Sequence, residues 1–290
     1  MMDTIGVIGI GAMGNGIAKN LIKAGYPLVA YRRDTASGAA AAEELASLGA
    51  AVTTSLPELY QTAKILITCL PNSQIVENLL IGNAGLSEQQ HPSIECVLDF
   101  STSHPDSTRK IAAILEAKGI EMLDTPMTGS VREAMEGTLK LIVGGNKKTF
   151  ERHVNILESV AVMVLYAGDH GTGNLVKLAN NYLAILDQAV TARIAIELEK
   201  FEIPADVYIK FLSGSSANSG GFQLMMRRIT TGDFSRKFGL ELATKDIGYC
   251  RDIFSLSITD RLYEILDDAG KAGYRDKDVG TIYTFLKENV

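Results

Sequence analysis

Short apolar runs alternate with helix-patterned segments over roughly the first 166 residues of the chain. The runs predict strands, because they are short and the segments between them carry apolar residues at helical spacing. Such alternation is typical of a parallel sheet with helices on both faces. The strands expected from these runs are 5–10, 28–31, 63–70, 96–100, 122–126, 140–143 and 163–166.

The pattern changes after Gly168. Neither proline nor glycine occurs between residues 174 and 201, and apolar residues recur there at helical spacing, which predicts a helix over about 173–201. At 1.5 Å per residue this helix is about 40 Å long, so we expect it to join two domains. The later patterns predict further helices, at 205–212, 221–230, 240–254, 258–269 and 281–289.

Composition fits two domains of moderate size. The chain has 290 residues, of which 46% are hydrophobic and 21% charged, enough to bury two modest cores. We expect a doubly wound α/β domain over residues 1–166 and an all-helical domain over 167–290. The net charge of −6 and the lack of a lysine-rich run argue against a nucleic-acid partner. No apolar stretch reaches membrane-spanning length, and the first strand begins too early for a signal peptide.

Cysteine and histidine usage predicts neither disulfides nor a metal. Cys69, Cys96 and Cys250 are widely spaced, and two of them lie in apolar runs. They are therefore expected to be free thiols in a reducing compartment, which favours a cytoplasmic location. The four histidines are isolated in the sequence and show no metal-ligand spacing, so we expect no metal.

A glycine-rich turn follows the first predicted strand, and a helix pattern and a second strand follow the turn. This order predicts a dinucleotide cradle, because a strand must end in glycines before the backbone can approach a pyrophosphate at a helix N-terminus. The first domain is therefore expected to be a Rossmann-type doubly wound sheet. The residues expected to contact the cofactor here are Gly9, Ile10, Gly11, Ala12, Met13, Gly14 and Asn15.

The residues just after the second strand indicate whether the domain binds NAD or NADP. An acidic residue there would bind the ribose 2′-hydroxyl of NAD, whereas arginine accommodates the 2′-phosphate of NADP. The chain has Arg32 and Arg33 at this place, so the sequence favours NADP(H). The alternative is that the arginines form a solvated loop and that Asp34 serves the ribose of NAD(H).

Ligands of an open parallel sheet bind just past the carboxyl ends of its strands. Four stretches with polar or glycine residues lie there, 70–72, 99–102, 124–130 and 144–145. In the third stretch, Thr128, Gly129 and Ser130 provide two hydroxyls and closely spaced backbone N–H groups that suit a substrate carboxylate. The same residues would also suit an ordinary turn after a strand.

Lys177 and Asn181 lie four residues apart, on one face of the long predicted helix. Gly171 and Gly173 precede them and would let the chain pass close to a ligand. A lysine beside a carbonyl oxygen can donate a proton as hydride reaches carbon, and can take it back in the reverse reaction. Desolvation beside a cationic nicotinamide would lower the lysine pKa toward the working range. The alternative is a lysine that only faces solvent.

Taken in order, these motifs resemble those of the β-hydroxyacid dehydrogenase family, which includes 3-hydroxyisobutyrate dehydrogenase, tartronate semialdehyde reductase and glyoxylate/succinic semialdehyde reductases. The resemblance runs from about residue 5 to about residue 252. It rests on the glycine-rich turn, the arginines after the second strand, and the stretches 70–72, 101–102, 124–130, 137–145, 171–181 and 245–246. It implies that Lys177 is the proton donor and acceptor, and that Asn181 orients the lysine or the substrate.

The resemblance also assigns further contacts. Leu70, Pro71, Thr102 and Lys245 match family positions that contact the cofactor. Thr102 could instead cap a helix that begins near Pro105.

Thr128 and Ser130 stand where the family motif usually has serine and glycine. The added methyl group and the lost glycine should reshape the pocket, so the identity of the substrate is open.

The function expected from the sequence is hydride transfer between nicotinamide C4 and a short carboxylate-bearing aldehyde or hydroxyacid. An NADPH-dependent semialdehyde or glyoxylate reductase is favoured. The alternatives are an NAD-dependent dehydrogenase of the 3-hydroxyisobutyrate type and a dinucleotide-binding interaction module without turnover. The apolar stretches 184–195 and 253–266 exceed what one small domain can cover, so we expect a homodimer or homotetramer.

Overall fold

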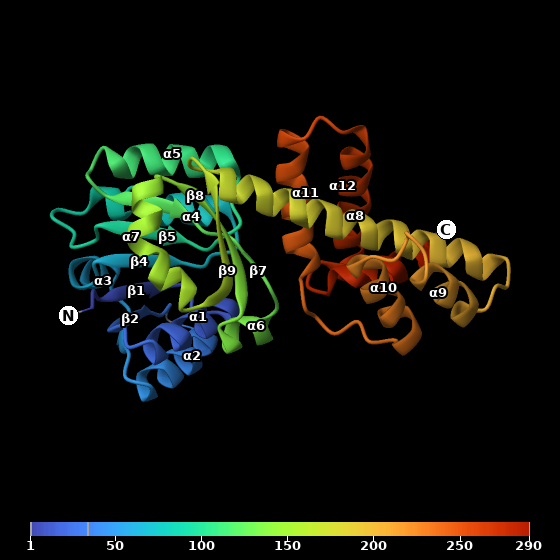
Figure 1. Cartoon of the computed structure of the whole chain (residues 1–290), viewed down its shortest axis with the longest axis horizontal. Helices are drawn as coiled ribbons and strands as arrows, with labels where there is room; N and C mark the ends of the chain where they lie inside the picture. The colour runs from blue at the N-terminus through green and yellow to red at the C-terminus, as the bar shows by residue number, and fades with distance from the viewer. Residues whose placement is uncertain (1, 34, 290) are drawn as a thin grey trace. The chain divides into compact units, whose positions relative to one another are not determined.

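The computed structural model describes residues 2–33 and 35–289, and it divides the chain after Lys177 into two compact units. The first unit contains a nine-stranded sheet (Figure 1). Its strands are β1 Ile5–Ile8, β2 Leu28–Tyr31, β3 Ala51–Thr53, β4 Ile65–Thr68, β5 Cys96–Asp99, β6 Glu121–Asp124, β7 Met127–Thr128, β8 Leu139–Gly145 and β9 Ala161–Gly168. Its helices are α1 Ala12–Lys23, α2 Ala36–Ser47, α3 Leu56–Thr62, α4 Ser73–Ile81, α5 Pro105–Glu116, α6 Val131–Glu136 and α7 Lys147–Glu158, with a 3₁₀ turn η1 at Leu86–Glu88.

The strand order is β3-β2-β1-β4-β5-β6-β8-β7, with β9 paired to β8. From β3 to β6 all neighbouring strands are parallel, as the alternating pattern predicts. The chain moves outward from β1 to β3 and then returns to the other side of β1 as β4. The loops after β1 and β4 therefore lie next to each other at the carboxyl edge, at a switch point where such sheets bind ligands.

The last strands of the sheet depart from the parallel arrangement that the alternating pattern predicts. β8 runs antiparallel to both β6 and β7, and only β9 is parallel to β8. The chain between β6 and β8 forms the two-residue β7 and the six-residue α6, which is too short a helix to cover the sheet as a crossover. This stretch therefore folds back along β8.

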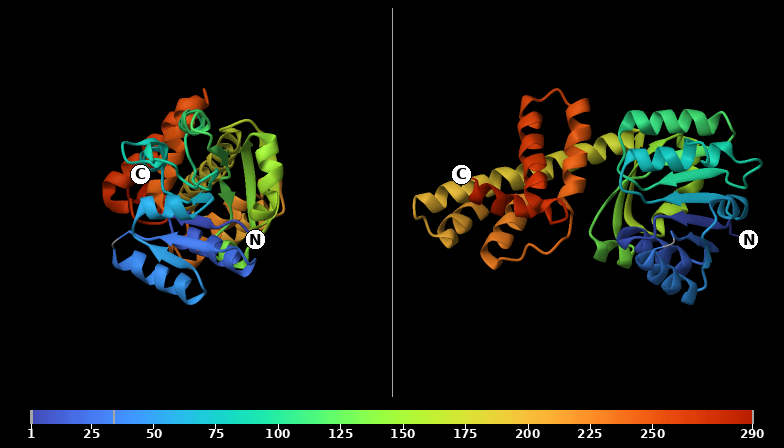
Figure 2. Two further views of the ribbon diagram at one scale, coloured as in Figure 1. Left: turned by 90° about the vertical axis from the view of Figure 1, so that its left-hand side faces the viewer. Right: turned by 180° about the vertical axis from the view of Figure 1, so that it is seen from behind.

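Helices cover both faces of the sheet, as Figure 2 shows. Side chains alternate along the strands, so that Val7 on β1 belongs to a core that includes residues of α1, α2 and α7, whereas Ile8 belongs to a core that includes residues of α3, α4 and α5. The strands contribute mainly buried aliphatic side chains to both cores, as expected for a parallel sheet covered on two sides.

The second unit is entirely helical in the part that is described. Helix α8 Thr172–Lys200 begins in the first unit and continues through the second, close to the helix expected over 173–201. It is followed by α9 Ala205–Ser213, α10 Gly220–Thr231, α11 Leu240–Ile253, α12 Ser257–Ala269, a π-helical turn η2 at Gly270–Tyr274, a 3₁₀ turn η3 at Val279–Thr281, and α13 Ile282–Glu288.

One face of α8 forms the core of this unit. Its buried positions recur every three or four residues, and they pack against α10, α11, α12 and α13. These positions are Leu178, Tyr182, Ile185, Ala189, Ala192 and Ile196. Within the described residues, no helix is both long enough and apolar enough to cross a membrane.

Candidate active site

The glycine-rich turn begins at Gly9, directly after β1. Gly9 has a φ of +98°, and a Cβ on it would lie 2.2 Å from the carbonyl oxygen of Cys69. A Cβ on Gly14 would lie 2.0 Å from the Gly9 carbonyl oxygen. Both glycines are therefore required by the packing of the turn against β4 and α1.

Gly11 differs from its two neighbours in the motif. It precedes α1 without a side-chain cap, and a Cβ on it would meet no atom of the described chain within 4 Å. Since no contact within the described chain requires this glycine, its small size fits the approach of a group from outside. The turn fits a dinucleotide, whose pyrophosphate Gly11 and the first turn of α1 would hold.

The other residues predicted for this turn differ in exposure. Ala12 is exposed and Met13 is half-buried, whereas Ile10 and Asn15 are buried.

Arg32 and Arg33 follow β2 at the same sheet edge as the turn, because Ile8 and Tyr31 are register partners. The Arg32 N–H donates to the carbonyl oxygen of Thr53 at 3.0 Å, which fixes the backbone of this tip. The Arg33 side chain is exposed. Asp34, the alternative ribose ligand, lies outside the described residues.

The loops after β4 and β5 are joined to each other. The Leu70 N–H donates to the Ser101 hydroxyl at 2.9 Å, while Pro71 next to it is exposed. Thr102 is half-buried in the second loop, and it does not cap α5. The cap is His104, whose Nδ1 accepts from the Asp106 N–H at 3.2 Å. The imidazole stands directly before the proline that starts the helix, so the alternative assignment of Thr102 as a helix cap is wrong.

Asp99 and Asp124 end two adjacent strands and are register partners. Asp99 is fully buried, and its Oδ1 accepts from the Thr68 hydroxyl at 2.8 Å and from the Ser101 N–H at 3.0 Å. Its Oδ2 has no hydrogen-bond partner among the described residues. Burial, aided by the charge of Asp124, raises the pKa of Asp99 to about 6.

Asp124 holds the start of α8. Its Oδ1 accepts from the Gly171 N–H at 2.8 Å and its Oδ2 from the Asn174 N–H at 2.9 Å. These donors belong to the helix N-terminus, where unpaired N–H groups and the helix dipole favour a carboxylate. Burial nevertheless raises the pKa of Asp124, because desolvation outweighs these hydrogen bonds.

Asn174 ties the same helix end to α5. Its Oδ1 accepts from the Ser103 N–H at 2.9 Å, and its Nδ2 donates to the Thr108 hydroxyl at 3.1 Å. Asn174 is fully buried. The first turn of α8 is therefore fixed from two directions, by Asp124 and through Asn174, one turn before Lys177.

The glycines around this helix start make room for protein atoms. A Cβ on Gly173 would lie 2.8 Å from Oδ2 of Asp124, and a Cβ on Gly144 would lie 2.6 Å from its Oδ1. A Cβ on Gly171 would lie 2.9 Å from the carbonyl oxygen of Pro105. The space beside Gly171 and Gly173 is therefore taken by the Asp124 carboxylate and by the start of α5, so the packing of the protein itself requires both glycines, and their closeness to a ligand stays a prediction.

Lys177 is half-buried on α8, and its Nζ lies 3.4 Å from Oγ1 of the exposed Thr128. At this distance the contact is a long hydrogen bond. The structure therefore brings the predicted proton donor and the predicted substrate motif together within the first unit. Gly129 follows with a φ of +145°, which strongly favours glycine.

Ser130 has a structural role that the sequence analysis did not predict. Its N–H donates to Glu133 Oε2 at 2.7 Å, and its hydroxyl accepts from the Glu133 N–H at 3.4 Å, so the two residues form a capping box at the start of α6. The backbone N–H of Ser130 is therefore occupied, and the expectation that it serves a substrate carboxylate is wrong for this group. The hydroxyl proton of Ser130 remains able to donate.

Asn181 and Lys245 meet through a third residue in the second unit. The Asn181 amide donates to Asp246 Oδ2 at 2.6 Å, and Lys245 Nζ lies 3.0 Å from Asp246 Oδ1. The Lys245 ammonium also lies 5.1 Å from the ring centroid of Tyr249. Asp246 is 2% exposed, so it orients both predicted residues from the interior.

Asp124, Asn174 and Asp246 lie in stretches that carry the family resemblance, but the sequence does not predict the hydrogen bonds that they make. For Asp124 the sequence does offer an indication. A carboxylate at the end of an apolar strand is expected to be buried, and a buried carboxylate needs hydrogen-bond donors. For the other two the pairing depends on residues far away in the sequence.

Comparison with known proteins places the chain among oxidoreductases. Residues 4–168 match the model of the NAD binding domain of 6-phosphogluconate dehydrogenase, and residues 171–286 match the NAD-binding model of NADP-dependent 3-hydroxyisobutyrate dehydrogenase. The chain thus has the binding domains for a nicotinamide dinucleotide.

Individual relatives agree. The chain is 35% identical to 3-sulfolactaldehyde reductase of Escherichia coli over 87% of its length and 83% of that protein. It is 31% identical to 3-hydroxyisobutyrate dehydrogenase of Pseudomonas aeruginosa, over 85% and 84%. The solved 3-hydroxyisobutyrate dehydrogenase of Mycobacterium tuberculosis superposes with a TM-score of 0.87 at 26% identity, over 99% of this chain and 100% of that one. The chain therefore belongs to the β-hydroxyacid dehydrogenase family of NAD(P)-dependent oxidoreductases.

Proposed function

We propose that this protein reduces a short, carboxylate-bearing aldehyde or oxoacid to the hydroxyacid with NADPH, and that Lys177 supplies the proton. The observation that carries the proposal is the position of Lys177 Nζ, 3.4 Å from the hydroxyl of Thr128 in the substrate motif. An aldehyde oxygen placed beside Lys177 Nζ would receive a hydrogen bond from it, while the Thr128 hydroxyl would face the acid group of the same substrate.

The chain's own residues perform orientation and proton transfer. A bound nicotinamide dinucleotide supplies the hydride. Lys177 Nζ donates a proton to the carbonyl oxygen as that oxygen gains charge, and it regains a proton from solvent afterwards. The hydroxyls of Thr128 and Ser130 are placed to hold the substrate acid group. Asp124 and Asn174 keep the helix that carries the lysine in one position, which is the contribution of preorganisation to the rate.

The preference for NADP(H) rests on Arg32 and Arg33. They follow β2 at the edge that carries the glycine-rich turn, where the 2′-substituent of the adenosine ribose is expected. Arginine binds a phosphate by charge and by paired hydrogen bonds. We expect Arg33→Ala to raise KM for NADPH and to leave KM for NADH unchanged.

The substrate class is drawn from the relatives and from the site. The names of the relatives specify 3-sulfolactaldehyde, 3-hydroxyisobutyrate, 2-(hydroxymethyl)glutarate and L-threonate, acids that carry an aldehyde or a hydroxyl group. The threonine methyl of residue 128 should reshape the site relative to the usual serine, and among the possible substrates we favour short semialdehydes and glyoxylate. The alternative is a 3-hydroxyisobutyrate-type dehydrogenase that uses NAD.

A substrate panel tests the proposal. Glyoxylate, succinic semialdehyde and tartronate semialdehyde are each offered with NADPH and with NADH, and 3-hydroxyisobutyrate with NAD and NADP. The proposal predicts the highest kcat/KM for one of the aldehydes with NADPH. Faster oxidation of 3-hydroxyisobutyrate with NAD would support the alternative. Cofactor binding without any turnover would support an interaction module.

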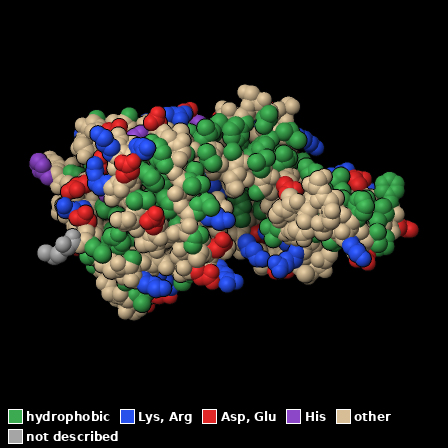
Figure 3. Space-filling model, in the orientation of Figure 1, with side chains coloured by type: hydrophobic (Ala, Val, Ile, Leu, Met, Phe, Trp, Pro, Cys, Tyr) green, Lys and Arg blue, Asp and Glu red, His purple; other side chains and the backbone are tan. Residues whose placement is uncertain are grey.

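We also propose that the protein is a homodimer or homotetramer. Along α8 and α9, a row of large apolar side chains faces away from the core of the second unit, and Figure 3 shows hydrophobic side chains gathered near the end that these helices form. Exposed apolar surface of this kind marks an interaction site. The side chains are Leu183, Val190, Ile194, Phe201, Val207 and Phe211. Light scattering should show at least a dimer, and Phe211→Ser should weaken it; a monomeric wild type would contradict the proposal.

A reducing, cytoplasmic compartment is proposed from the thiols. The three cysteines are free, and Cys96 and Cys250 are buried. Burial raises the pKa of Cys69 and of Cys250 to about 12 each, so both thiols stay protonated and are poor nucleophiles.

A further inference from the structure

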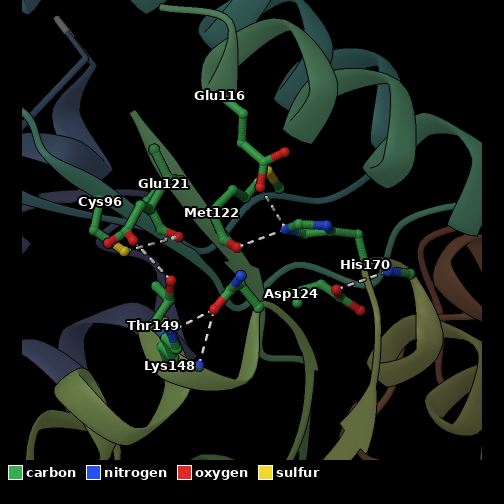
Figure 4. A network of polar contacts seen from close by, with 12 residues as sticks. Cys96, Glu116, Glu121, Met122, Asp124, Lys148, Thr149 and His170 are labelled. Carbon is green, nitrogen blue, oxygen red and sulfur yellow. Dashed lines mark hydrogen bonds and ion pairs between the residues drawn. The ribbon is translucent and has the colours of Figure 1, made fainter. Parts of the chain in front are cut away.

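We propose that Cys96, Glu121 and His153 form a binding site for Zn²⁺ at the amino edge of the sheet, remote from the dinucleotide turn. One ligand atom from each residue lies within 4.8 Å of the other two. Cys96 and Glu121 are the first residues of β5 and β6 and are register partners, and α7 places His153 beside them. Figure 4 shows the Cys96 and Glu121 side chains next to each other.

A second observation points to a ligand. His153 is only 8% exposed, and among the described residues its ring takes part in no hydrogen bond or ion pair. The ring nitrogens are not among the fully buried side-chain atoms that lack a partner, so they keep some accessible surface and are open to a ligand, although the residue as a whole is buried. A metal ion bound between the three side chains would give this ring the partner it lacks.

The surroundings hold the carboxylate in place. Glu121 Oε1 accepts from the Thr149 hydroxyl at 2.9 Å, and Oε2 pairs with Arg152 at 2.6 Å. Thr149 lies three residues before Arg152 and four before His153 on α7, so it can contact both side chains. Hydrogen bonds of this kind orient the ligands of metal sites, and each oxygen keeps a lone pair for the ion.

The chemical types of the three ligand atoms indicate which metal ion binds. A thiolate, an imidazole and a carboxylate suit Zn²⁺, whereas Mg²⁺ and Ca²⁺ prefer oxygen ligands alone. On binding, the Cys96 thiol loses its proton to solvent and a sulfur–zinc bond forms. The charges of the thiolate and of Glu121 then balance the ion. Arg152, Asp3 and Glu95 also act electrostatically on His153, and Lys64 pairs with both Asp3 and Glu95.

The three ligands come from β5, β6 and α7, so bound zinc should hold these three elements together at this edge of the first unit. Residues 96, 121 and 153 are too far apart in the sequence to form a spacing motif, which is why the sequence analysis expected no metal. Three protein ligands leave a fourth position for water.

Cobalt provides the test, because Co²⁺ bound to a thiolate gives an ultraviolet charge-transfer band. The full chain, first treated with a chelator, is titrated with Co²⁺, and the cobalt is then displaced with Zn²⁺. The proposal predicts one Co²⁺ per chain with a thiolate band. It further predicts that Cys96→Ser abolishes the band, and that His153→Ala and Glu121→Gln each weaken Zn²⁺ binding at least about tenfold.

Cys250→Ser is the matched control, because Cys250 is a buried free thiol in the other unit; this variant should keep the band. Glu121 is only half-buried, so Glu121→Gln serves where another variant fails to fold. Zn²⁺ should raise the melting temperature of the wild type and have a smaller effect on Glu121→Gln. Absence of a thiolate band in the wild type, or equal Zn²⁺ affinity in wild type, Cys96→Ser and Glu121→Gln, would overturn the proposal.

Discussion

Replacing Asp124 with asparagine tests how the site positions its lysine. The change keeps the shape of the side chain but leaves one oxygen where two now accept the N–H groups of Gly171 and Asn174, at 2.8 and 2.9 Å. The new amide group then meets one of these donors, so one N–H at the start of α8 loses its acceptor. The first turn of the helix should shift, and Lys177 should move with it.

The loss of hydrogen bonding in Asp124→Asn destabilises the fold, and the removal of a buried charge opposes this loss. A hydrogen bond to a charged acceptor contributes about 1.5–3 kcal/mol, and a buried donor without a partner costs about 1–3 kcal/mol. Burial raises the pKa of Asp124, so removing its charge offsets part of this loss. We therefore expect the free energy of unfolding to fall by about 2 kcal/mol. We expect kcat to fall about 10- to 100-fold, since small misplacements of a catalytic group have effects of this size.

Urea unfolding, kcat and KM for NADPH are the measurements. KM for NADPH should stay within about twofold, because the Asp124 carboxylate accepts hydrogen bonds from Gly171 and Asn174, which lie outside the glycine-rich turn. Asp169→Asn is the control: Asp169 is exposed near the same helix end, so it removes a similar charge without removing an acceptor. Unchanged kcat and stability in Asp124→Asn, or equal losses in Asp169→Asn, would refute the reasoning.

Two further substitutions test the cradle and the buried acid. Gly11→Ala should leave stability unchanged and weaken dinucleotide binding at least about tenfold by titration calorimetry, because its Cβ meets only the bound group. Gly14→Ala should instead lower stability. Equal effects of the two substitutions on stability and on binding would contradict this prediction. Burial raises the pKa of Asp99 from 3.8 to about 6, so the folded state binds a proton that the unfolded chain releases, and stability falls as pH rises through this window. Relative to Asp99→Asn, the wild type should therefore lose about 3 kcal/mol of unfolding free energy between pH 3.5 and 7, measured by urea titrations. A difference between the two proteins that does not change with pH would count against the raised pKa of Asp99.

The parts of the fold that the sequence predicts correctly are those set by local pattern. The apolar runs predict the parallel strands β1, β2, β4, β5 and β6, and the uninterrupted helical spacing predicts α8 to within a residue at each end. The direction of β8 could not be predicted in this way. An apolar run gives the same pattern in either direction, and only the shortness of α6 shows that the chain folds back.

The site shows the same division. The order of strand, glycines and helix identifies the turn, and the glycine positions in it follow from local geometry. The roles of Gly171 and Gly173 could not be predicted, because the atoms that occupy their space come from β6 and α5, far away in the sequence. A hydroxyl at a strand end suits an anion, which is why the sequence favours a substrate contact for Ser130. The glutamate three residues later is the local sign of the capping box that the structure shows.

The central claim is that Lys177 transfers the proton in the reaction, and its replacement by alanine is the most direct test. Lys200→Ala, on the same helix, is the control, because Lys200 is a surface residue paired with Glu197. With the best aldehyde substrate and saturating NADPH, we predict that kcat of Lys177→Ala falls at least about 100-fold, while NADPH binding and the kcat of Lys200→Ala stay near those of the wild type. Turnover by Lys177→Ala at the wild-type rate would contradict the claim.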